Sequence, residues 1–289
     1  MIKKPYLFSL LLIPFVSCQL SGVENEEEEL NDTSIVQNTI DSSEIEVPMM
    51  LEDSINGAPN EMVFQRNDGL RIEWTTKKDD QIQLNDVVMV NYTARVAAGE
   101  VYDSNKPLGE PVPLKTNIGM MIKGWEEGLL MMHIGDKGRI MIPSDLAYGE
   151  DGYLTIVPPR ADIIVDIEIV SRVEPVKLES GVLVYKWKSS TEGKTPVKNQ
   201  LITFDYFAYK KGNKPGMYDN SYQNEAPFSF KYEYTNVVEG LHIGMSVMKA
   251  GENAFIEIPS KMAYGSKGLV DLVPANTDIV YDVRVASIE

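Results

Sequence analysis

The stretch from Gly119 to Tyr148 reads GMMIKGWEEGLLMMHIGDKGRIMIPSDLAY. Its first half carries apolar residues at helical spacing: Ile122, Trp125, Leu129 and Met132. This pattern predicts a short amphipathic helix that ends at Gly135. Apolar and polar side chains then alternate from 138 to 142, which is typical of a half-buried strand, and Pro143 stops that strand.

The whole pattern occurs twice in the chain. The aligned pairs include Trp125 with Leu241, Pro143 with Pro259 and Tyr148 with Tyr264. The offset is 116 in each case, for example 264 minus 148. A constant offset of this length indicates two copies of a whole domain, because solenoid units repeat every 20 to about 50 residues. We expect a first repeat at 66–174, with its core at 85–173, and a second at 175–289, with its core at 199–289.

Alternating patterns predict the fold class of each repeat. Residues 88–92 and 163–169 alternate between apolar and polar side chains, as amphipathic strands do. Strands with one polar face indicate an antiparallel sheet, and the single helix around Trp125 is expected to cover the other face. The sequence therefore predicts an α+β fold.

The amino-terminal residues 1–17 read as a secretory signal peptide. Lys3 and Lys4 precede an apolar run that is shorter than the roughly 20 residues of a membrane-spanning helix. The four residues that end at Cys18 resemble a bacterial lipobox, which implies that Cys18 is lipidated, with Phe15 in place of the usual leucine. The alternative is an ordinary cleaved signal and an incidental cysteine. A single cysteine also excludes internal disulfides.

Residues 18–65 are predicted to form an acidic, disordered tether. No Lys or Arg occurs from Gln19 to Gln65, and a segment so rich in Glu, Ser, Asn and Thr cannot bury enough apolar surface to fold. It is either a solvated spacer or, through Glu26 to Glu29, a sorting tract like those of some surface lipoproteins. The net charge of the chain, -16, argues against nucleic-acid binding.

The usual constellations of catalytic residues are absent from the sequence. His133 and His242 occupy different places in the two repeats and lack the spacing of metal ligands. Neither a Ser-His-Asp arrangement nor a Gly-rich phosphate loop occurs. Glu126 and Glu127 are adjacent on the helix and point in different directions, so we expect a solvated face. No metal and no cofactor are expected.

The first repeat resembles the FKBP-type peptidyl-prolyl cis-trans isomerases. The matching segments follow the order of that family: 88–93, 101–104, 122–128, Met132, Gly135, 147–149, 156–159 and 163–166. Several motifs in one order over about a hundred residues make chance agreement improbable. The resemblance implies two tandem FKBP-like domains, each a twisted, mostly antiparallel sheet wrapped around a short helix.

The resemblance also implies a catalytic pocket in the first repeat. Its residues would be Tyr92, Tyr102, Asp103, Met121, Ile122, Trp125, Tyr148, Tyr153, Ile156 and Val165. Trp125 would form the floor, Asp103 would lie at the rim, and the Ile122 amide and the Tyr148 hydroxyl would donate hydrogen bonds to substrate carbonyls. Val112 and Val165 stand where the family usually has aromatic residues, so a wider pocket is expected.

The corresponding pocket of the second repeat departs from the family pattern in other ways. Its residues would be Tyr206, Tyr218, Asp219, Phe228, Val238, Leu241, Tyr264 and Tyr281. Leu241 replaces the tryptophan floor, Leu269 replaces the aromatic residue at Tyr153, and Ala275 replaces the second proline. This copy is either a spacer or peptide-binding surface, or a second, weaker isomerase.

Taken together, the resemblance implies an isomerase that assists the folding of proline-containing cell-envelope proteins, with the first domain as the main catalyst. The alternative is a non-catalytic chaperone or peptide-binding module of the envelope, or a structural adaptor. The expected partners are proline-containing polypeptide clients, with membrane contact through the lipid anchor only. We expect a monomeric outer-membrane lipoprotein, either periplasmic or surface-exposed.

Overall fold

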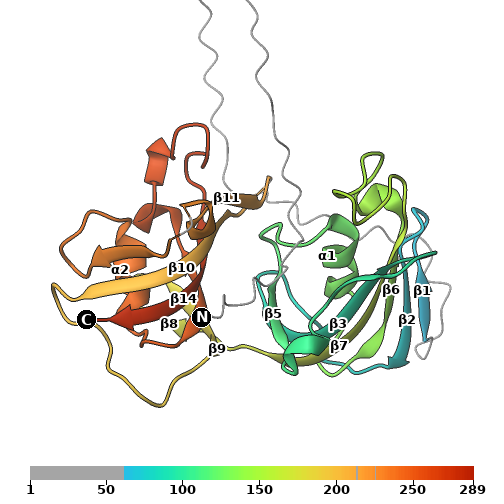
Figure 1. Cartoon of the computed structure of the whole chain (residues 1–289), viewed down its shortest axis with the longest axis horizontal. Coiled ribbons are helices and arrows are strands. Elements are labelled where there is room, and N and C mark those ends of the chain that lie inside the picture. The colour runs from blue at the N-terminus through green and yellow to red at the C-terminus, as the bar shows by residue number, and fades with distance from the viewer. Residues whose placement is uncertain (1–61, 213, 225) are drawn as a thin grey trace, which may run out of the picture. The chain divides into compact units, whose positions relative to one another are not determined.

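The computed structural model describes residues 62–212, 214–224 and 226–289. These residues form two β-sheets, one in each repeat, and each repeat has one α-helix (Figure 1). The elements of the first repeat are β1 Val63–Gln65, β2 Arg71–Thr76, β3 Val87–Val96, β4 Val101–Ser104, β5 Val112–Lys115, α1 Lys123–Leu130, β6 Lys137–Ile142 and β7 Ile163–Arg172. Those of the second are β8 Val176–Lys177, β9 Leu183–Lys188, β10 Leu201–Lys210, β11 Gly216–Asn220, β12 Phe228–Lys231, α2 Glu239–Met245, β13 Asn253–Ile258 and β14 Ile279–Ile288.

The two sheets have the same strand order. The first runs β1-β2-β6-β7-β3-β4, with β5 also paired to β3. The second runs β8-β9-β13-β14-β10-β11, with β12 paired to β10. Every strand pairing in both sheets is antiparallel. The predicted α+β class and the tandem repeat are therefore confirmed.

The strands predicted from alternation are present, because alternate side chains enter the core. In β7, Ile163, Val165, Ile167 and Ile169 are buried, whereas the residues between them are partly exposed. Both faces of β3 are largely buried near its middle, and β3 also pairs with three strands, β4, β5 and β7. The two long strands thus carry the centre of the first core.

The helix is shorter than the sequence pattern indicates. Ile122 is its N-cap, and the helix ends at Leu130, so Met132 is buried beyond its end and Gly135 lies in the following turn. Glycines at 124 and 128 let the helix approach β6 closely. A Cβ added at Gly124 would lie 2.4 Å from Cγ2 of Ile142, which is well inside van der Waals contact.

In each repeat, one strand (β2 in the first, β9 in the second) is fixed to the turn after the helix, and the two repeats use different chemistry for this contact. In the first, the Trp74 indole donates to the buried carboxylate of Asp136 at 2.9 Å. In the second, the Lys186 ammonium pairs with Glu252 at 2.7 Å. Both carboxylates also accept backbone N–H groups of the turn, so the same junction is held by a neutral donor in one copy and by an ion pair in the other.

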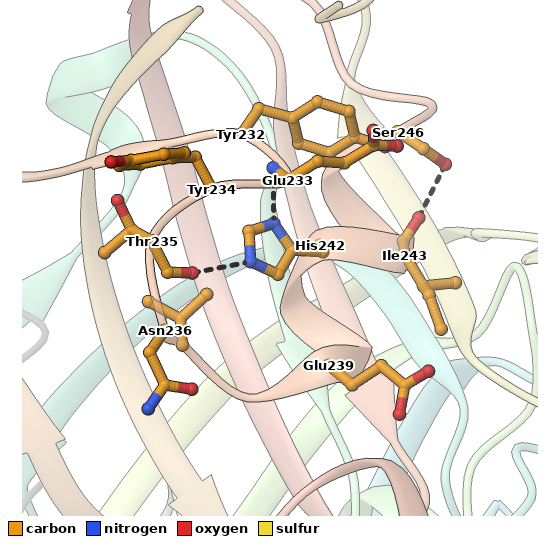
Figure 2. Close-up of a pocket in the computed structure, with 10 residues that line it drawn as sticks. Tyr232, Glu233, Tyr234, Thr235, Asn236, Glu239, His242, Ile243 and Ser246 are labelled. Atoms are coloured by element: carbon orange, nitrogen blue, oxygen red, sulfur yellow. Dashed lines mark hydrogen bonds between the residues drawn. The ribbon is translucent and has the colours of Figure 1, made fainter. Parts of the chain in front are cut away.

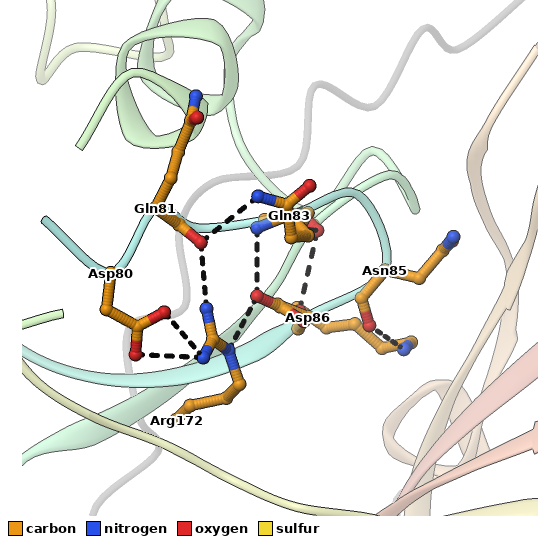
Figure 3. A network of polar contacts seen from close by, with 8 residues as sticks. Asp80, Gln81, Gln83, Asn85, Asp86 and Arg172 are labelled. Atoms are coloured by element: carbon orange, nitrogen blue, oxygen red, sulfur yellow. Dashed lines mark hydrogen bonds and ion pairs between the residues drawn. The ribbon is translucent and has the colours of Figure 1, made fainter. Parts of the chain in front are cut away.

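Arg172 at the end of β7 holds the segment that leads into β3. Its guanidinium contacts the carboxylates of Asp80 and Asp86 and donates to the carbonyl of Gln81 (Figure 3). Asp86 in turn accepts the N–H of Gln83 at 2.9 Å. This network positions Asn85, whose carbonyl accepts a hydrogen bond from Lys115 at 2.8 Å.

Lys115, the last residue of β5, connects the two repeats. Its ammonium is fully buried, lies 2.8 Å from Glu257 on β13, and stands 4.2 Å from the centre of the Tyr185 ring. Glu257 also pairs with Lys211 at 2.5 Å. Tyr185, Tyr209, Phe255 and Val280 belong to the same buried apolar cluster as the first core. Residues 62–289 accordingly form one compact unit.

The predicted signal peptide, Cys18 and nearly all of the predicted tether lie outside the described residues. Among the helices that the structure describes, none is long and apolar enough to cross a membrane.

Candidate functional site

We use the name first cleft for the group of residues predicted to form the pocket of the first repeat; its floor residues, Trp125 and Tyr92, come from α1 and β3. Trp125 is completely buried, and the Tyr92 ring meets its indole edge-on, with centroids 5.0 Å apart at 66°. Helical spacing turns Trp125 toward the sheet, and the close glycine contacts bring the helix near enough for the two rings to touch. Aromatic pairs in this geometry are favourable beyond their buried area.

Asp103 is held beside this floor. The Tyr92 hydroxyl donates to Asp103 Oδ2 at 2.7 Å. Asn105 fixes the neighbouring turn, because its side chain accepts the Tyr92 N–H at 2.7 Å and donates to the Glu110 carbonyl at 2.8 Å. Burial raises the pKa of Asp103, and the hydrogen bonds from Tyr92 and the Ser104 backbone only partly oppose this increase.

Three polar atoms of the first cleft are buried and have no hydrogen-bond partner among the described residues. They are the Tyr102 hydroxyl, the Tyr148 hydroxyl and the Trp125 indole nitrogen. The Tyr102 and Tyr148 rings meet edge-on at 6.5 Å. Burial raises the pKa of Tyr148 to about 12, so its hydroxyl keeps its proton at neutral pH. Buried donors without partners are costly, and a bound carbonyl would satisfy them.

The loop after β6 carries the far wall of the cleft. Tyr153 stacks at a tilt on Tyr148, with centroids 5.1 Å apart, and its N–H donates to the Val157 carbonyl. Gly152 has a φ of 67°, and a Cβ there would lie 2.3 Å from the Val157 carbonyl oxygen. This glycine therefore lets the loop fold back on itself.

The structure brings the predicted residues of the first repeat together, with one exception. Met121, Ile122 and Val165 are buried in the same apolar cluster as Tyr92 and Trp125, and Tyr102, Tyr148 and Tyr153 pack against it. Ile156 is 36% exposed, whereas its neighbour Val157 is 1% exposed and buried in the cluster. The sequence analysis missed Val157 because two adjacent apolar residues give no signal as to which one points inward.

The second cleft repeats the tyrosine-carboxylate pair but not the floor. Tyr206 donates to Asp219 at 2.6 Å, as Tyr92 does to Asp103. Leu241 is buried where Trp125 would lie, and aromatic residues fill the sides instead. The Tyr206 ring is 6.1 Å from Phe228 and 5.4 Å from Tyr281.

The hydroxyls of the second cleft are engaged differently. Tyr218, which corresponds to Tyr102, donates to the Tyr281 hydroxyl at 3.5 Å, and its ring meets Tyr264 edge-on at 6.4 Å. Val238 is the N-cap of α2, as Ile122 is of α1. Six of the eight predicted residues share one apolar cluster, and the other two, Phe228 and Asp219, contact Tyr206. The Tyr218 hydroxyl has a partner within this group.

The predicted solvated face of α1 is corrected at one residue. Glu127 pairs with Arg66 at 2.5 Å near the surface. Glu126 turns inward instead and accepts a hydrogen bond from the Asn117 N–H. Burial raises the pKa of Glu126, and the Asn117 bond opposes the increase. The sequence could not show this contact, because the loop that supplies the N–H precedes the helix by several residues.

A separate, open pocket of about 590 Å³ lies beside α2. Its lining residues are Tyr232, Glu233, Tyr234, Thr235, Asn236, Val237, Glu239, His242, Ile243 and Ser246. None of the residues predicted for the pocket of the second repeat lines it. The half-buried imidazole of His242 lines this pocket and lies between the helix and the preceding loop (Figure 2).

The sequence of the chain matches a known protein family in both repeats. The family of FKBP-type peptidyl-prolyl cis-trans isomerases matches residues 78–170 and again residues 192–286. The chain therefore belongs to the FKBP-type peptidyl-prolyl cis-trans isomerase family and contains two copies of its domain. The repeated match and the repeated strand order describe the same duplication.

Individual relatives match one repeat or both. Peptidyl-prolyl cis-trans isomerase FPR2 of Saccharomyces cerevisiae is 42% identical over 86 residues, which are 29% of this chain and 64% of the yeast protein. Peptidyl-prolyl cis-trans isomerase FKBP9 of Homo sapiens is 28% identical over 210 residues, which are 71% of this chain and 35% of the human protein. The chain thus spans less than two thirds of either relative.

Among solved structures, the crystal structure of the three FKBP domains of wheat FKBP73 is 23% identical to the chain, with a TM-score of 0.38. The alignment covers 77% of this chain and 96% of the wheat chain.

Proposed function

We propose that the protein is a peptidyl-prolyl cis-trans isomerase and that its first repeat is the main catalyst. The observation that carries this proposal is the pair of buried hydroxyls, those of Tyr102 and Tyr148, which have no hydrogen-bond partner among the described residues and whose rings pack on the apolar cluster that contains Trp125. They surround an apolar floor and can donate to the carbonyls that flank a proline. Family membership supports the same activity.

The chemistry requires no nucleophile. The barrier to rotation about the peptide bond, about 18–20 kcal/mol, comes from amide resonance, which is lost when the bond twists. The twisted amide is less polar than the planar one, so a water-poor cleft favours it over the ground state. A donor fixed beside a neighbouring carbonyl holds the chain while the bond rotates.

Four residues of the first cleft have a role in this scheme. The Tyr148 hydroxyl anchors a substrate carbonyl. The flat face of Trp125, which the structure buries completely, supports the pyrrolidine ring once the side chains above it have moved aside. Asp103, held by Tyr92, lies beside the rotating amide. The donors are set in place before substrate arrives, because the rings that carry them pack on one another.

The second repeat is proposed to bind clients and to catalyse weakly. Leu241 offers no flat surface for a proline ring, and the Tyr218 hydroxyl already has Tyr281 as a partner. Apolar residues nevertheless stand exposed on this repeat. Phe228 is 38% exposed, Leu272 is 44% exposed and Val270 is 82% exposed. These side chains can contact extended apolar chains, as the chaperone alternative requires, and the first repeat exposes Leu154 and Ile156 at two equivalent positions.

The proposed location is the cell envelope, with Cys18 lipidated and the acidic segment as a tether. The amino-terminal sequence supports this proposal. Two acyl chains anchor a protein stably, so the mature protein should sediment with membranes, and Cys18→Ala should release it or leave it unprocessed. Recovery of the wild type entirely in the soluble envelope fraction would rule out the anchor.

Activity is best tested in the full chain, because the repeats share a buried cluster and the Lys115–Glu257 pair. Exchange of an X-Pro peptide would be followed for the wild type, for Tyr148→Phe and for the matched variant Tyr264→Phe. We expect Tyr148→Phe to lower kcat/KM about tenfold, the effect of one lost hydrogen bond, and Tyr264→Phe to have little effect. A larger loss with Tyr264→Phe would assign catalysis to the second repeat.

A further inference from the structure

The segment before each helix is fixed to that helix by the same contact in both repeats. Asn117 and Glu233, which are 116 residues apart, both have a positive φ, 64° and 53°. The N–H of each donates to the helix residue that follows the cleft floor. The acceptor is the Glu126 carboxylate in the first repeat and Nδ1 of His242, at 3.2 Å, in the second.

His242 makes a second contact with the same segment. Its Nε2 lies 3.0 Å from the Thr235 carbonyl oxygen (Figure 2). Because Nδ1 accepts the Glu233 N–H, the ring proton must be on Nε2, which donates to Thr235. The neutral imidazole therefore holds the segment at two points, two residues apart.

These contacts lie next to the second cleft. The Thr235 carbonyl also accepts the Val237 N–H at 3.0 Å, and Val238 follows as the N-cap of α2. Val238 is the position from which a backbone N–H is expected to meet a substrate carbonyl. His242 is thus linked to Val238 through the Thr235 carbonyl and its hydrogen bond from Val237, the residue that precedes Val238, and His242 is not itself one of the residues predicted for the cleft.

Protonation of His242 would break one of the two contacts. An imidazolium carries N–H groups at both nitrogens, so Nδ1 could no longer accept the Glu233 N–H and would face it donor to donor. A carboxyl group differs in this respect, because Glu126 keeps an acceptor oxygen after protonation. The equivalent contact in the first repeat is therefore less sensitive to acid.

Several charged and titratable groups surround the imidazole. Glu239 lies on the same helix, and Glu233, Tyr232 and Tyr234 come from the loop. The rings of Phe230 and Tyr232 meet the imidazole edge-on at 5.1 and 5.7 Å. Lys231, the cation on β12, lies over the Tyr234 ring at 5.8 Å.

We propose that His242 is a positioning residue of the second cleft and that its protonation weakens the binding of proline-containing peptides there. This inference rests on the proposed role of the second repeat as a client-binding site. Binding should weaken when the imidazole gains a proton, because one of its two contacts with the segment is then lost. The first cleft, with Glu126 in the equivalent place, should not share this dependence.

The test uses the full chain and a short proline-containing peptide. Binding at the second cleft would be followed by NMR through the amide signals of Val238 and Glu233, at pH 7.5 and pH 5.5. We expect the Kd to rise about threefold to tenfold at the lower pH, the change that one hydrogen bond can cause. The Glu233 signal should shift over the same pH range.

Three variants distinguish positioning from a general effect of acid. His242→Glu restores the acceptor of the first repeat, and His242→Gln supplies a neutral acceptor; both should remove the pH dependence. His133→Asn changes the other histidine of the chain and should leave the dependence intact. Peptide binding that is the same at both pH values in the wild type would overturn this inference alone. Absence of binding to the second cleft at either pH would overturn the proposed role of the second repeat as well.

Discussion

The hydroxyl of Tyr92 donates to Asp103 Oδ2 at 2.7 Å, in a cleft where burial raises the pKa of that carboxyl group. The second repeat preserves the pair as Tyr206 and Asp219 at 2.6 Å, although its cleft has lost the tryptophan. The pair is therefore independent of the floor. It links β3 to β4 in the first repeat and β10 to β11 in the second.

Removal of the Tyr92 hydroxyl is expected to raise the pKa of Asp103 further, because the hydrogen bond favours the charged carboxylate. A carboxyl group whose pKa is raised on folding favours the folded state at acid pH. That contribution is lost as the pH rises above the ordinary value of 3.8 and through the folded pKa. In Tyr92→Phe this loss should occur at higher pH.

Carboxyl-carbon NMR of the full chain would measure this titration directly. Tyr206→Phe is the matched control, because it removes the equivalent hydroxyl from the second repeat and should leave Asp103 unchanged. A pKa of Asp103 that is lower in Tyr92→Phe than in the wild type would contradict the prediction.

The buried carboxylate of Glu257 is expected to be important for stability. Burial alone would raise its pKa, but Lys115 and Lys211 outweigh that effect and lower it. A group with a lowered pKa stabilises the folded state above its ordinary value of 4.5, and this contribution is lost as the pH falls through the folded pKa. Glu257→Gln leaves Lys115 buried without its counter-charge, and should lower the free energy of unfolding by about 3–5 kcal/mol.

The contrast is the exposed pair of Glu150 and Arg160, in which both side chains are largely in solvent. Glu150→Gln should change the free energy of unfolding by less than about 1 kcal/mol. Urea denaturation of the two variants at pH 7 compares the pairs. Equal effects would show that the Lys115 environment is far more hydrated than its burial indicates.

The close approach of α1 to β6 is predicted to tolerate no methyl group. In Gly124→Ala the new Cβ would lie 2.4 Å from Ile142 Cγ2 and 2.9 Å from Leu146 Cβ. Overpacking of this kind costs about 1–3 kcal/mol, more than alanine gains over glycine in helix propensity. Thermal unfolding should show a lower Tm. Lys123→Ala, at an exposed position of the same helix, should leave the Tm nearly unchanged.

The elements of the fold were predictable because they depend on local patterns. Alternation in 163–169 and helical spacing around Trp125 reflect which side chains one sheet and one helix must bury. Helix length was less predictable. Met132 lies beyond the end of the helix but is still buried, so in the sequence it looks like a continuation of the apolar stripe. The duplication was predictable from the constant offset alone.

Contacts between distant segments were not predictable. Lys115 reads as an ordinary polar residue at the end of a strand, and its burial depends on Glu257 in the other repeat. Glu126 reads as half of a solvated pair, but a loop N–H turns it inward. His242 gave no signal because its partners are backbone atoms, which no sequence pattern reveals.

The difference between the two floors leads to the last prediction. Leu241→Trp should increase X-Pro exchange by the second repeat, because an indole supplies the flat surface that leucine lacks. The side chain would enter a cluster already filled by Tyr206, Tyr281 and Met245, so overpacking of about 1–3 kcal/mol is also expected. Exchange should be measured in a Tyr148→Phe background, in which the contribution of the first cleft is reduced.

The converse change, Trp125→Leu, places the floor of the second repeat in the first and should lower kcat/KM by about a hundredfold if imperfect positioning of the ring is the cause. It removes a large buried side chain, so the folded fraction must be checked by circular dichroism before rates are compared. Unchanged turnover in a folded Trp125→Leu protein would show that the indole is a packing residue and that the division of labour between the repeats depends on the tyrosine hydroxyls alone.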